Sequence, residues 1–256
     1  MNIFKTLRYV EIETCSSCTR KCNWCLFGNY SNVRPIENSL LETDVIIRIF
    51  KDLRENEFRG TIALYSINEP LLDDRIKSGK LLLICKKMLG NTVKISLTTN
   101  GDLLSKSIIE KLFSSGLDKM KISCYDDESY EKAQFMQNLD SRVLILDQRR
   151  YQKGEFESNR GGSIKSLRNL NISFFNCYMP KYRTVVGWDG QVRLCPHEML
   201  TRISLGNVYY NNLYDILMSE KAIILRDTLE NNRKQIYPCN LCNIKGDEYY
   251  MKQHLE

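Results

Sequence analysis

The chain has 256 residues and a formal net charge of +6, which leaves room for one large domain or a main domain with a small appendage. The basic residues are dispersed, so no nucleic-acid partner is indicated. No apolar run approaches the roughly eighteen residues of a membrane span, and no apolar signal region follows the first residues. We therefore expect a cytoplasmic protein without a membrane segment, in which ten cysteines stay reduced and available for metal.

The first half of the chain alternates predicted strands and helices. Apolar periodicity predicts strands at 8–14, 61–65, 93–97, 119–124 and 142–146, and helices at 40–53, 76–89, 108–113 and 128–138. Ser39 with Glu42 predicts a capping box for the first helix, and Gly116 predicts the end of the third. Because parallel neighbours need a crossover, the alternation predicts a parallel α/β sheet with helices outside it.

Three cysteines follow directly after the first predicted strand, in the stretch 13–28. Cys18, Cys22 and Cys25 are separated by three and two residues, so one short loop can bring all three thiols to one small metal cluster. An iron–sulfur cluster held by three thiolates keeps one iron open to another ligand. A zinc loop is the alternative, because Cys15 adds a second Cys-x-x-Cys. Paired zinc ligands are normally a dozen or more residues apart, however, which favours the open cluster.

Polar residues follow three further predicted strands. Asn68-Glu69-Pro70 follows the second strand, Thr99-Asn100 ends the third, and Ser123 ends the fourth. In parallel α/β folds the ligand lies at the carboxyl ends of the strands. We therefore expect these segments and the cysteine loop to converge on one mouth, although any single polar residue is equally explained as the cap of a strand end.

A second set of cysteines lies in the last third of the chain. Its members are separated by 17, 43 and 2 residues: Cys177, Cys195, Cys239 and Cys242. Four thiolates complete the shell of a second iron–sulfur cluster or of zinc. Asp189-Gly190 predicts a hairpin between strands at 182–186 and 191–194, and short helices are expected at 213–218 and 222–229. Such a unit buries little core, so a metal is expected to hold it together.

Two further residues are candidates for contact with a substrate. Arg160 precedes two glycines that permit a sharp turn, and its planar guanidinium can bind an oxygen or a carboxylate. His197 lies two residues beyond Cys195, where it is either a proton acceptor near neutral pH or a plain surface histidine; His254 is the only other histidine. Two more cysteines are expected to be buried apolar residues: Cys85 and Cys124.

The Cys18-x3-Cys22-x2-Cys25 spacing resembles the signature of the radical S-adenosylmethionine (radical SAM) superfamily. The resemblance implies a partial (β/α)6 barrel over residues 1–165 and a small twitch or SPASM-like domain over 166–256. It implies two 4Fe-4S clusters, the first of which binds the amino and carboxylate groups of S-adenosylmethionine through its fourth iron. Reductive cleavage would then give a 5'-deoxyadenosyl radical that takes a hydrogen atom from the substrate. A flavodoxin or ferredoxin is the implied electron donor.

The resemblance also implies roles for individual residues. Trp24 corresponds to an aromatic residue near the adenine, and Cys15 lies outside the cluster-binding triad. Asn68-Glu69-Pro70 is similar to the Gly-Glu-Pro segment that binds the amino group, with Asn68 in place of glycine. Arg160 corresponds to an arginine that faces the substrate. The residues implied to line the methionine or ribose part of the cofactor are Thr99, Asn100 and Ser123, and those implied to hold the auxiliary cluster are Cys177, Cys195, Cys239 and Cys242.

Among enzymes with this layout, the chain resembles the 2-deoxy-scyllo-inosamine dehydrogenases in residues 58–72, 99–103 and 159–162 and in the four-cysteine spacing. It departs from them at Asn68 and at Pro196-His197, so their substrate is not carried over. We predict an oxidoreductase of natural-product biosynthesis that abstracts a hydrogen atom from a small polar metabolite or a peptide and passes the second electron to the auxiliary cluster.

Two alternatives stay open. One is a maturase that epimerises or crosslinks a ribosomally made peptide, although no leader-binding domain is expected ahead of Arg8. The other is a non-catalytic iron–sulfur carrier or zinc-binding protein, which would need no pocket for S-adenosylmethionine. The polar residues at the strand ends favour an enzyme over a carrier.

Overall fold

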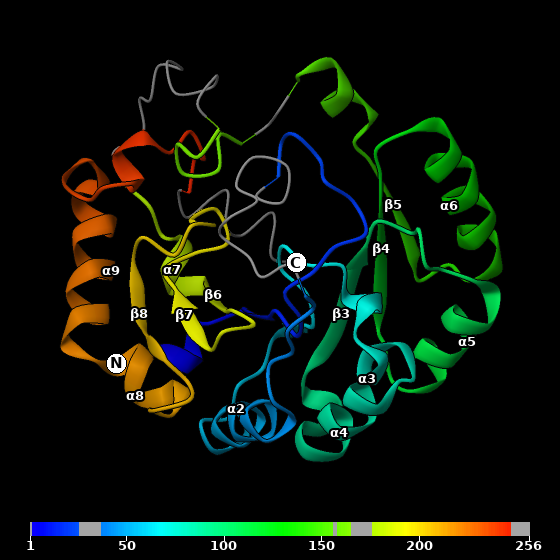
Figure 1. The fold of residues 1–256 in the computed structure, drawn as a ribbon. Helices are drawn as coiled ribbons and strands as arrows, with labels where there is room; N and C mark the ends of the chain where they lie inside the picture. Colours follow the sequence, from blue (N-terminus) through cyan, green and yellow to red (C-terminus); the bar gives the residue numbers. More distant parts are fainter. Residues whose placement is uncertain (1, 26–36, 156–157, 165–175, 247–256) are drawn as a thin grey trace.

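The computed structural model describes residues 2–25, 37–155, 158–164 and 176–246. Within these ranges, one sheet runs in the order β5-β4-β3-β2-β1-β6-β7-β8 (Figure 1), with β5 and β8 at its two ends, so it does not close into a barrel. The strands of the first half are parallel to their neighbours. Their bounds are β1 (Tyr9–Ile12), β2 (Thr61–Ala63), β3 (Lys94–Thr99), β4 (Lys119–Cys124) and β5 (Val143–Asp147).

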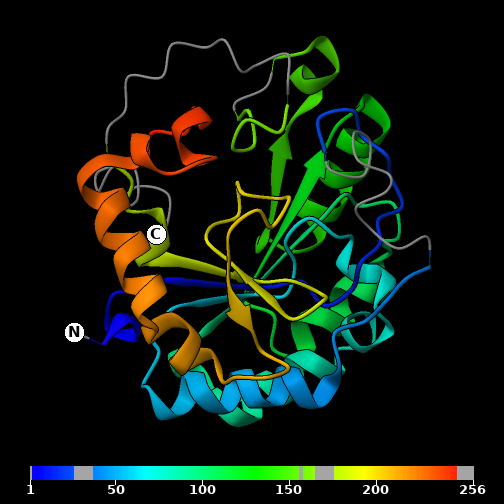
Figure 2. The ribbon, with the colours of Figure 1, turned by 60° about the vertical axis from the view of Figure 1, so that its left-hand side comes forward.

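Helices connect these strands and cover the outside of the sheet (Figures 1 and 2). They are α2 (Thr43–Glu55), α3 (Asp74–Lys77), α4 (Lys80–Leu89), α5 (Lys106–Ser114) and α6 (Asp127–Leu139). Short 3-10 turns are η1 (Ile3–Lys5), η2 (Pro70–Leu72), η3 (Gly90–Thr92) and η4 (Arg149–Lys153). The predicted α/β class, with helices outside a parallel sheet, is confirmed. None of the described helices combines the length and the apolar composition needed to cross a bilayer.

The capping box predicted for the first long helix is wrong. Glu42 is the N-cap residue of α2 and makes no side-chain cap bond. The preceding residues are extended and pair with the chain that leaves β1: the Ser16 N–H donates to the Ser39 carbonyl (2.8 Å), and the Leu41 N–H donates to the Thr14 carbonyl (3.0 Å). Because its backbone is used in this pairing, Ser39 is too far from the helix to cap it.

The predicted helix at 76–89 is two helices, α3 and α4, separated at Gly79. This glycine has a φ of 79°, in the left-handed region where side chains are strained. A Cβ atom at this position would also lie 2.1 Å from the Ser115 Oγ of the neighbouring turn. Both constraints require glycine here, and the helix breaks at it.

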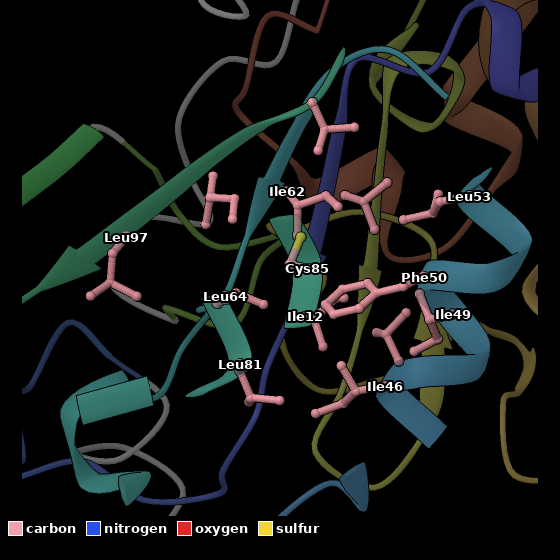
Figure 3. Packing of buried hydrophobic residues seen from close by; sticks show 14 of the residues in the cluster. Ile12, Ile46, Ile49, Phe50, Leu53, Ile62, Leu64, Leu81, Cys85 and Leu97 are labelled. Atoms are coloured by element: carbon pink, nitrogen blue, oxygen red, sulfur yellow. The ribbon is translucent and has the colours of Figure 1, made fainter. Parts of the chain in front are cut away.

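The core lies between the sheet and its helices. Ile46, Ile49 and Phe50 of α2 point toward Ile12 of β1 and Ile62 of β2 (Figure 3), and all five are at most 1% exposed. Burying each such side chain contributes about 1.5–3 kcal/mol, so this layer fixes the strands whose ends carry the candidate site. The two cysteines expected to be buried are so, each with no exposed surface: Cys85 and Cys124.

The C-terminal segment extends the same sheet. β6 (Arg183–Val186) is parallel to β1, with Tyr9 opposite Arg183, and it forms the predicted hairpin with the antiparallel β7 (Gln191–Arg193). The remaining elements are β8 (Ser204–Asn207), α7 (Met179–Tyr182), α8 (Leu213–Met218), α9 (Glu220–Asn232), η6 (Arg233–Gln235) and η7 (Cys239–Leu241). Figure 2 shows α8 and α9 outside the hairpin strands. The division at 165/166 falls at residues outside the described ranges and stays a prediction.

Candidate active site

A cavity of about 390 Å³ lies at the carboxyl ends of β1 to β4. The expected convergence of the cysteine loop and the strand-end segments is confirmed, because all of them line this cavity together with the segment around Arg160. The predicted residues that line it are Cys18, Cys22, Cys25, Trp24, Asn68, Glu69, Thr99, Asn100, Ser123, Arg160 and His197. Their individual roles stay predictions.

The thiols of the cysteine loop are close enough to raise one another's pKa. Burial raises the pKa of Cys18 to about 12, with further contributions from Cys22 and Cys25, and burial and Cys25 raise the pKa of Cys22 to about 11. Such thiols become thiolates when a cation compensates their charge. Among the described residues no group of His, Cys, Asp and Glu could hold a single metal ion. In a four-iron cluster, by contrast, each thiolate bonds a different iron. The three thiols of this loop therefore suit a four-iron cluster better than a single ion.

The cysteine loop is anchored to the sheet by Arg20. Its guanidinium lies 2.6 Å from a carboxylate oxygen of Asp102, after β3, and 2.7 Å from one of Asp126, after β4. Thr19 adds a hydroxyl bond to Asp102 (2.8 Å), and the Asn100 side chain donates to the Thr19 hydroxyl (2.8 Å). Sequence reasoning missed this anchor, although an arginine between two cluster cysteines and aspartates after two strands pointed to it.

Glu69 is a carboxylate with almost no exposure to solvent. It is 1% exposed and accepts hydrogen bonds from the Thr99 hydroxyl (2.7 Å) and from the backbone N–H of Asn100 (2.8 Å) and Leu71 (3.2 Å). Burial raises its pKa to about 7. No lysine or arginine of the described ranges forms an ion pair with it, so it is suited to accept hydrogen bonds from the amino group of a ligand.

Cys15 lies behind the cavity. Its side chain is fully buried, and the Asn68 side-chain amide donates to its sulfur (3.2 Å). Cys15 also forms an antiparallel bridge with Leu40, and burial raises the pKa of its thiol to about 11. Its sulfur therefore fixes the turn at Asn68, and Cys15 is not among the residues that line the cavity. Its place outside the triad stays a prediction.

One wall of the cavity is aromatic. The Trp24 ring is 8% exposed and packs on Tyr125 and Tyr151, with ring centroids 5.3 and 5.8 Å apart. The Ser123 side chain, at the end of β4, hydrogen-bonds Tyr125 and lines the same cavity. The wall offers flat apolar surface with hydroxyl groups at its edge, which suits an adenine and a ribose.

The cavity is also lined by a polar network that sequence reasoning missed. Arg183 of β6 pairs with Glu11 of β1, and its guanidinium lies 4.4 Å above the Tyr9 ring. The Tyr9 hydroxyl lies 2.7 Å from Ser96 Oγ and 3.2 Å from the Tyr65 hydroxyl. All four positions of β1 are buried, so a glutamate within it indicated a polar interior at this point.

Arg160 and His197 lie on the side of the cavity nearest the second cysteine set. Arg160 has a φ of 51°, and its backbone N–H donates to Ser158 Oγ, which lies 3.1 Å from His197 Nδ1. Burial and the charges of Arg160 and Arg183 lower the pKa of His197 to about 3. In the cluster-free protein this imidazole is therefore neutral and weakly basic at pH 7, and its role as a proton acceptor stays a prediction.

The second cysteine set forms its own cluster of thiols. The pKa of Cys195 is raised by burial and by the nearby thiols of Cys239, Cys242 and Cys177. At Gly246 a Cβ atom would lie 2.6 Å from the Cys177 sulfur, so the chain closes tightly over this thiol. Four converging, half-buried thiols fit a metal cluster, which supplies the positive charge needed to ionise them.

A buried arginine stands beside these thiols. Arg233 is 1% exposed and donates to the carbonyls of Ile244 (2.5 Å) and Cys242 (2.8 Å). Its charge favours the thiolate form of Cys177, Cys239 and Cys242. This arginine was not singled out in the sequence, because a lysine and arginine pair at the end of a helix is usually a solvated helix end.

Comparison with known proteins agrees with this layout. Residues 12–130 match the radical SAM superfamily, and residues 177–243 match the SPASM family, described as an iron–sulfur cluster-binding domain. The chain therefore belongs to the radical SAM superfamily and is an enzyme of that class, with a SPASM-type domain at its C-terminal side. Its cofactors are S-adenosylmethionine and two 4Fe-4S clusters.

Individual relatives are distant. An uncharacterized protein of Methanocaldococcus jannaschii, MJ0804, is 31% identical over 114 residues, which span 44% of this chain and 32% of that protein. The crystal structure of BtrN in complex with AdoMet and 2-DOIA superposes with a TM-score of 0.78 at 20% identity, over 95% of this chain and 97% of BtrN. AnSMEcpe with bound AdoMet gives a TM-score of 0.59 at 15% identity, over 93% and 85%. These two likenesses establish the fold.

Proposed function

We propose that this enzyme oxidises a small polar metabolite or a peptide in natural-product biosynthesis by radical chemistry. The observation that carries the proposal is the single cavity at which the cysteine loop, the buried Glu69 and the segment around Arg160 meet. A carrier of clusters needs no such cavity. BtrN, which shares the fold, was crystallised with AdoMet and 2-DOIA, and this supports a small polar substrate.

The residues of the first site would hold the cofactor as follows. Cys18, Cys22 and Cys25 would bind the first cluster, and Glu69 would accept hydrogen bonds from the amino group of S-adenosylmethionine. Trp24 would pack near the adenine. Asn68, Thr99, Asn100 and Ser123 would complete the lining, and the ligands of the second cluster would be Cys177, Cys195, Cys239 and Cys242.

When bound, these cofactors would supply a 5'-deoxyadenosyl radical that takes one hydrogen atom from the substrate and, at the second cluster, an acceptor for the electron that remains. The proton released with that electron would pass to a nearby base or to solvent. A flavodoxin or ferredoxin would deliver the first electron. Arg160 would orient the substrate through an oxygen, because its segment is fixed to the second cysteine set: Asn159 donates to the Leu241 carbonyl (2.6 Å). His197, neutral at pH 7, would stand beside it as a hydrogen-bonding group.

The proposal is tested by anaerobic reconstitution of the wild type and of a Cys18→Ala/Cys22→Ala/Cys25→Ala variant. Iron and sulfide are counted, and 5'-deoxyadenosine is measured after addition of dithionite and S-adenosylmethionine. We expect about eight irons in the wild type and about four in the variant, with 5'-deoxyadenosine formed by the wild type alone.

A Cys85→Ala variant is the matched control, because this fully buried cysteine does not line the cavity and is not among the thiols that act on Cys195. It should keep about eight irons. Reductive cleavage that is absent from a fully loaded wild type would reject the enzymatic proposal in favour of a carrier. Four irons that fall to none, with zinc remaining, would reject the second cluster as electron acceptor.

A further inference from the structure

The charged groups of the cavity divide into those with an ion-pair partner and those without one. Arg20 is paired with Asp102 and Asp126, and Arg183 is paired with Glu11. Two more cations line the cavity, Lys121 and Arg160. Among the described residues, neither has a carboxylate within the 4.0 Å of an ion pair. The cavity therefore holds positive charge that the chain does not neutralise in the ranges described.

Lys121 stands in the middle of β4, where a charge is costly. It pairs with Thr98 of β3 and Leu144 of β5, and the residues on either side of it in the strand are buried. Burial lowers the pKa of its ammonium group, with further contributions from Lys119 and Arg183. A half-buried cation among other cations is destabilised until an anion binds to it. A solvated lysine would have no reason to occupy this position.

The charge of Arg160 acts within the same cavity. It favours the ionised form of Tyr125 and the neutral form of His197, both of which line the cavity. In the second cysteine set, the charge of Arg233 favours the thiolate form of three thiols instead. The charge of Arg183 disfavours the charged forms of both Lys121 and His197. The three cations therefore surround one space, and only Arg183 has a described carboxylate partner.

The described carboxylates of the cavity wall are both engaged. Glu11 is bound to Arg183, and Glu69 faces the amino group of S-adenosylmethionine under the proposed function, on which this step rests. We infer that the substrate carries an anionic oxygen group, a carboxylate or a phosphate, and that Lys121 and Arg160 bind it. A protonated amine at this place would meet cations without a free carboxylate, so such substrates are selected against.

The test measures anion binding to the fully reconstituted protein with S-adenosylmethionine present. Inorganic phosphate and succinate are titrated separately by isothermal titration calorimetry, and the protonated amine tris(hydroxymethyl)aminomethane is the cationic probe. We expect at least one anion to bind, and Lys121→Gln to weaken it about tenfold or more, because a charge-assisted hydrogen bond is lost. Phosphate binding alone indicates a phosphate ester, and succinate binding alone indicates a carboxylate.

Lys119→Gln is the matched control, since it removes the same charge two residues earlier on β4 at an exposed position. It should leave anion affinity within about twofold. Should Lys121→Gln fail to fold, Arg160→Gln measures the same loss from a loop. Equal affinity in wild type and both cavity variants, or binding of the amine alone, would overturn the inference. Production of 5'-deoxyadenosine by the same preparation tests the proposed function separately. A protein that binds the anion but forms no 5'-deoxyadenosine would reject the proposed function and still support the anion site.

Discussion

At the scale of single residues, Glu69 shows how burial prepares a group for a ligand. The carboxylate is surrounded by donors from the second and third strand ends, yet it has almost no contact with water. Desolvation outweighs these hydrogen bonds, because the pKa is raised to about 7 instead of lowered. In the cofactor-free protein the desolvation of this carboxylate therefore costs free energy, and hydrogen bonds from N–H groups of a ligand can offset that cost.

This cost predicts a pH dependence of stability in the cluster-free protein. An acid whose pKa rises from 4.5 unfolded to about 7 folded binds more protons in the folded state between these values. The free energy of unfolding should therefore fall as pH rises from 4.5 to 7, by about 3 kcal/mol from this group. Glu69→Gln should remove this component, and urea denaturation at several pH values measures it.

The exposed Glu110 provides the control for this experiment, because Glu110→Gln changes the same group on the surface of α5. Its pH profile should follow that of the wild type. A Glu69→Gln profile with the wild-type slope between pH 4.5 and 7 would contradict the raised pKa.

The predicted and the missed site residues differ in where they stand on their strands. Asn68, Glu69 and Asn100 follow strands, and the rule that parallel sheets bind ligands at the carboxyl ends was enough to find them. Glu11 and Lys121 lie inside strands β1 and β4, and both line the cavity. Alternation of apolar and polar residues was interpreted only as a strand pattern, whereas a charge among the buried residues of a strand has a physical cost that must have a reason.

At the scale of elements, β1 and the residue that follows it are tied to the C-terminal hairpin by two ion pairs. Glu11 pairs with Arg183 of β6, and Glu13 pairs with Arg193 of β7 at 2.8 Å. The second pair is almost completely buried, with side-chain exposures of 0% and 4%. Sequence spacing could not reveal these contacts, because about 180 residues separate the partners and the pairing depends on β6 lying beside β1.

The Glu13–Arg193 pair should therefore show strong coupling. Arg193→Met leaves a buried carboxylate without its cation, and we expect a loss of about 3–5 kcal/mol in the free energy of unfolding. Glu13→Gln/Arg193→Met removes both charges and should recover part of this loss. Urea denaturation of the cluster-free protein measures both variants.

The matched control for the buried pair is Lys51→Met in α2, which breaks an exposed pair with Glu55. It should change stability by less than about 1 kcal/mol. Strictly additive effects of Glu13→Gln and Arg193→Met would argue that the two side chains do not interact across the sheet.

At the scale of the whole molecule, the N-terminal part, with the first cysteine set, and the C-terminal part, with the second, share one hydrophobic core. This core includes Ile12 and Phe50 from the N-terminal part together with Val186, Val192 and Leu229 from the C-terminal part. The sequence predicted two parts from composition and cysteine spacing, and it placed the hairpin correctly. It could not predict that β6 continues the sheet beside β1, because strand pairing between distant segments leaves no periodic pattern in the sequence.

A shared core predicts that the chain unfolds as one unit even though the clusters are separate. The two tryptophans report on the two parts, since Trp24 lies in the cysteine loop and Trp188 in the turn between β6 and β7. The Trp24→Phe and Trp188→Phe variants each keep one tryptophan as a reporter of unfolding. Adding Cys239→Ser to either variant removes the second cluster. The urea midpoint should then fall in both, because metal binding stabilises only the folded chain. Cys22→Ser provides the comparison for the first cluster. Coincident transitions are the signature of one cooperative unit. Separate transitions, with Trp24 unaffected by Cys239→Ser, would show that the C-terminal part folds alone and that the continuous sheet transmits no stability between the two sites.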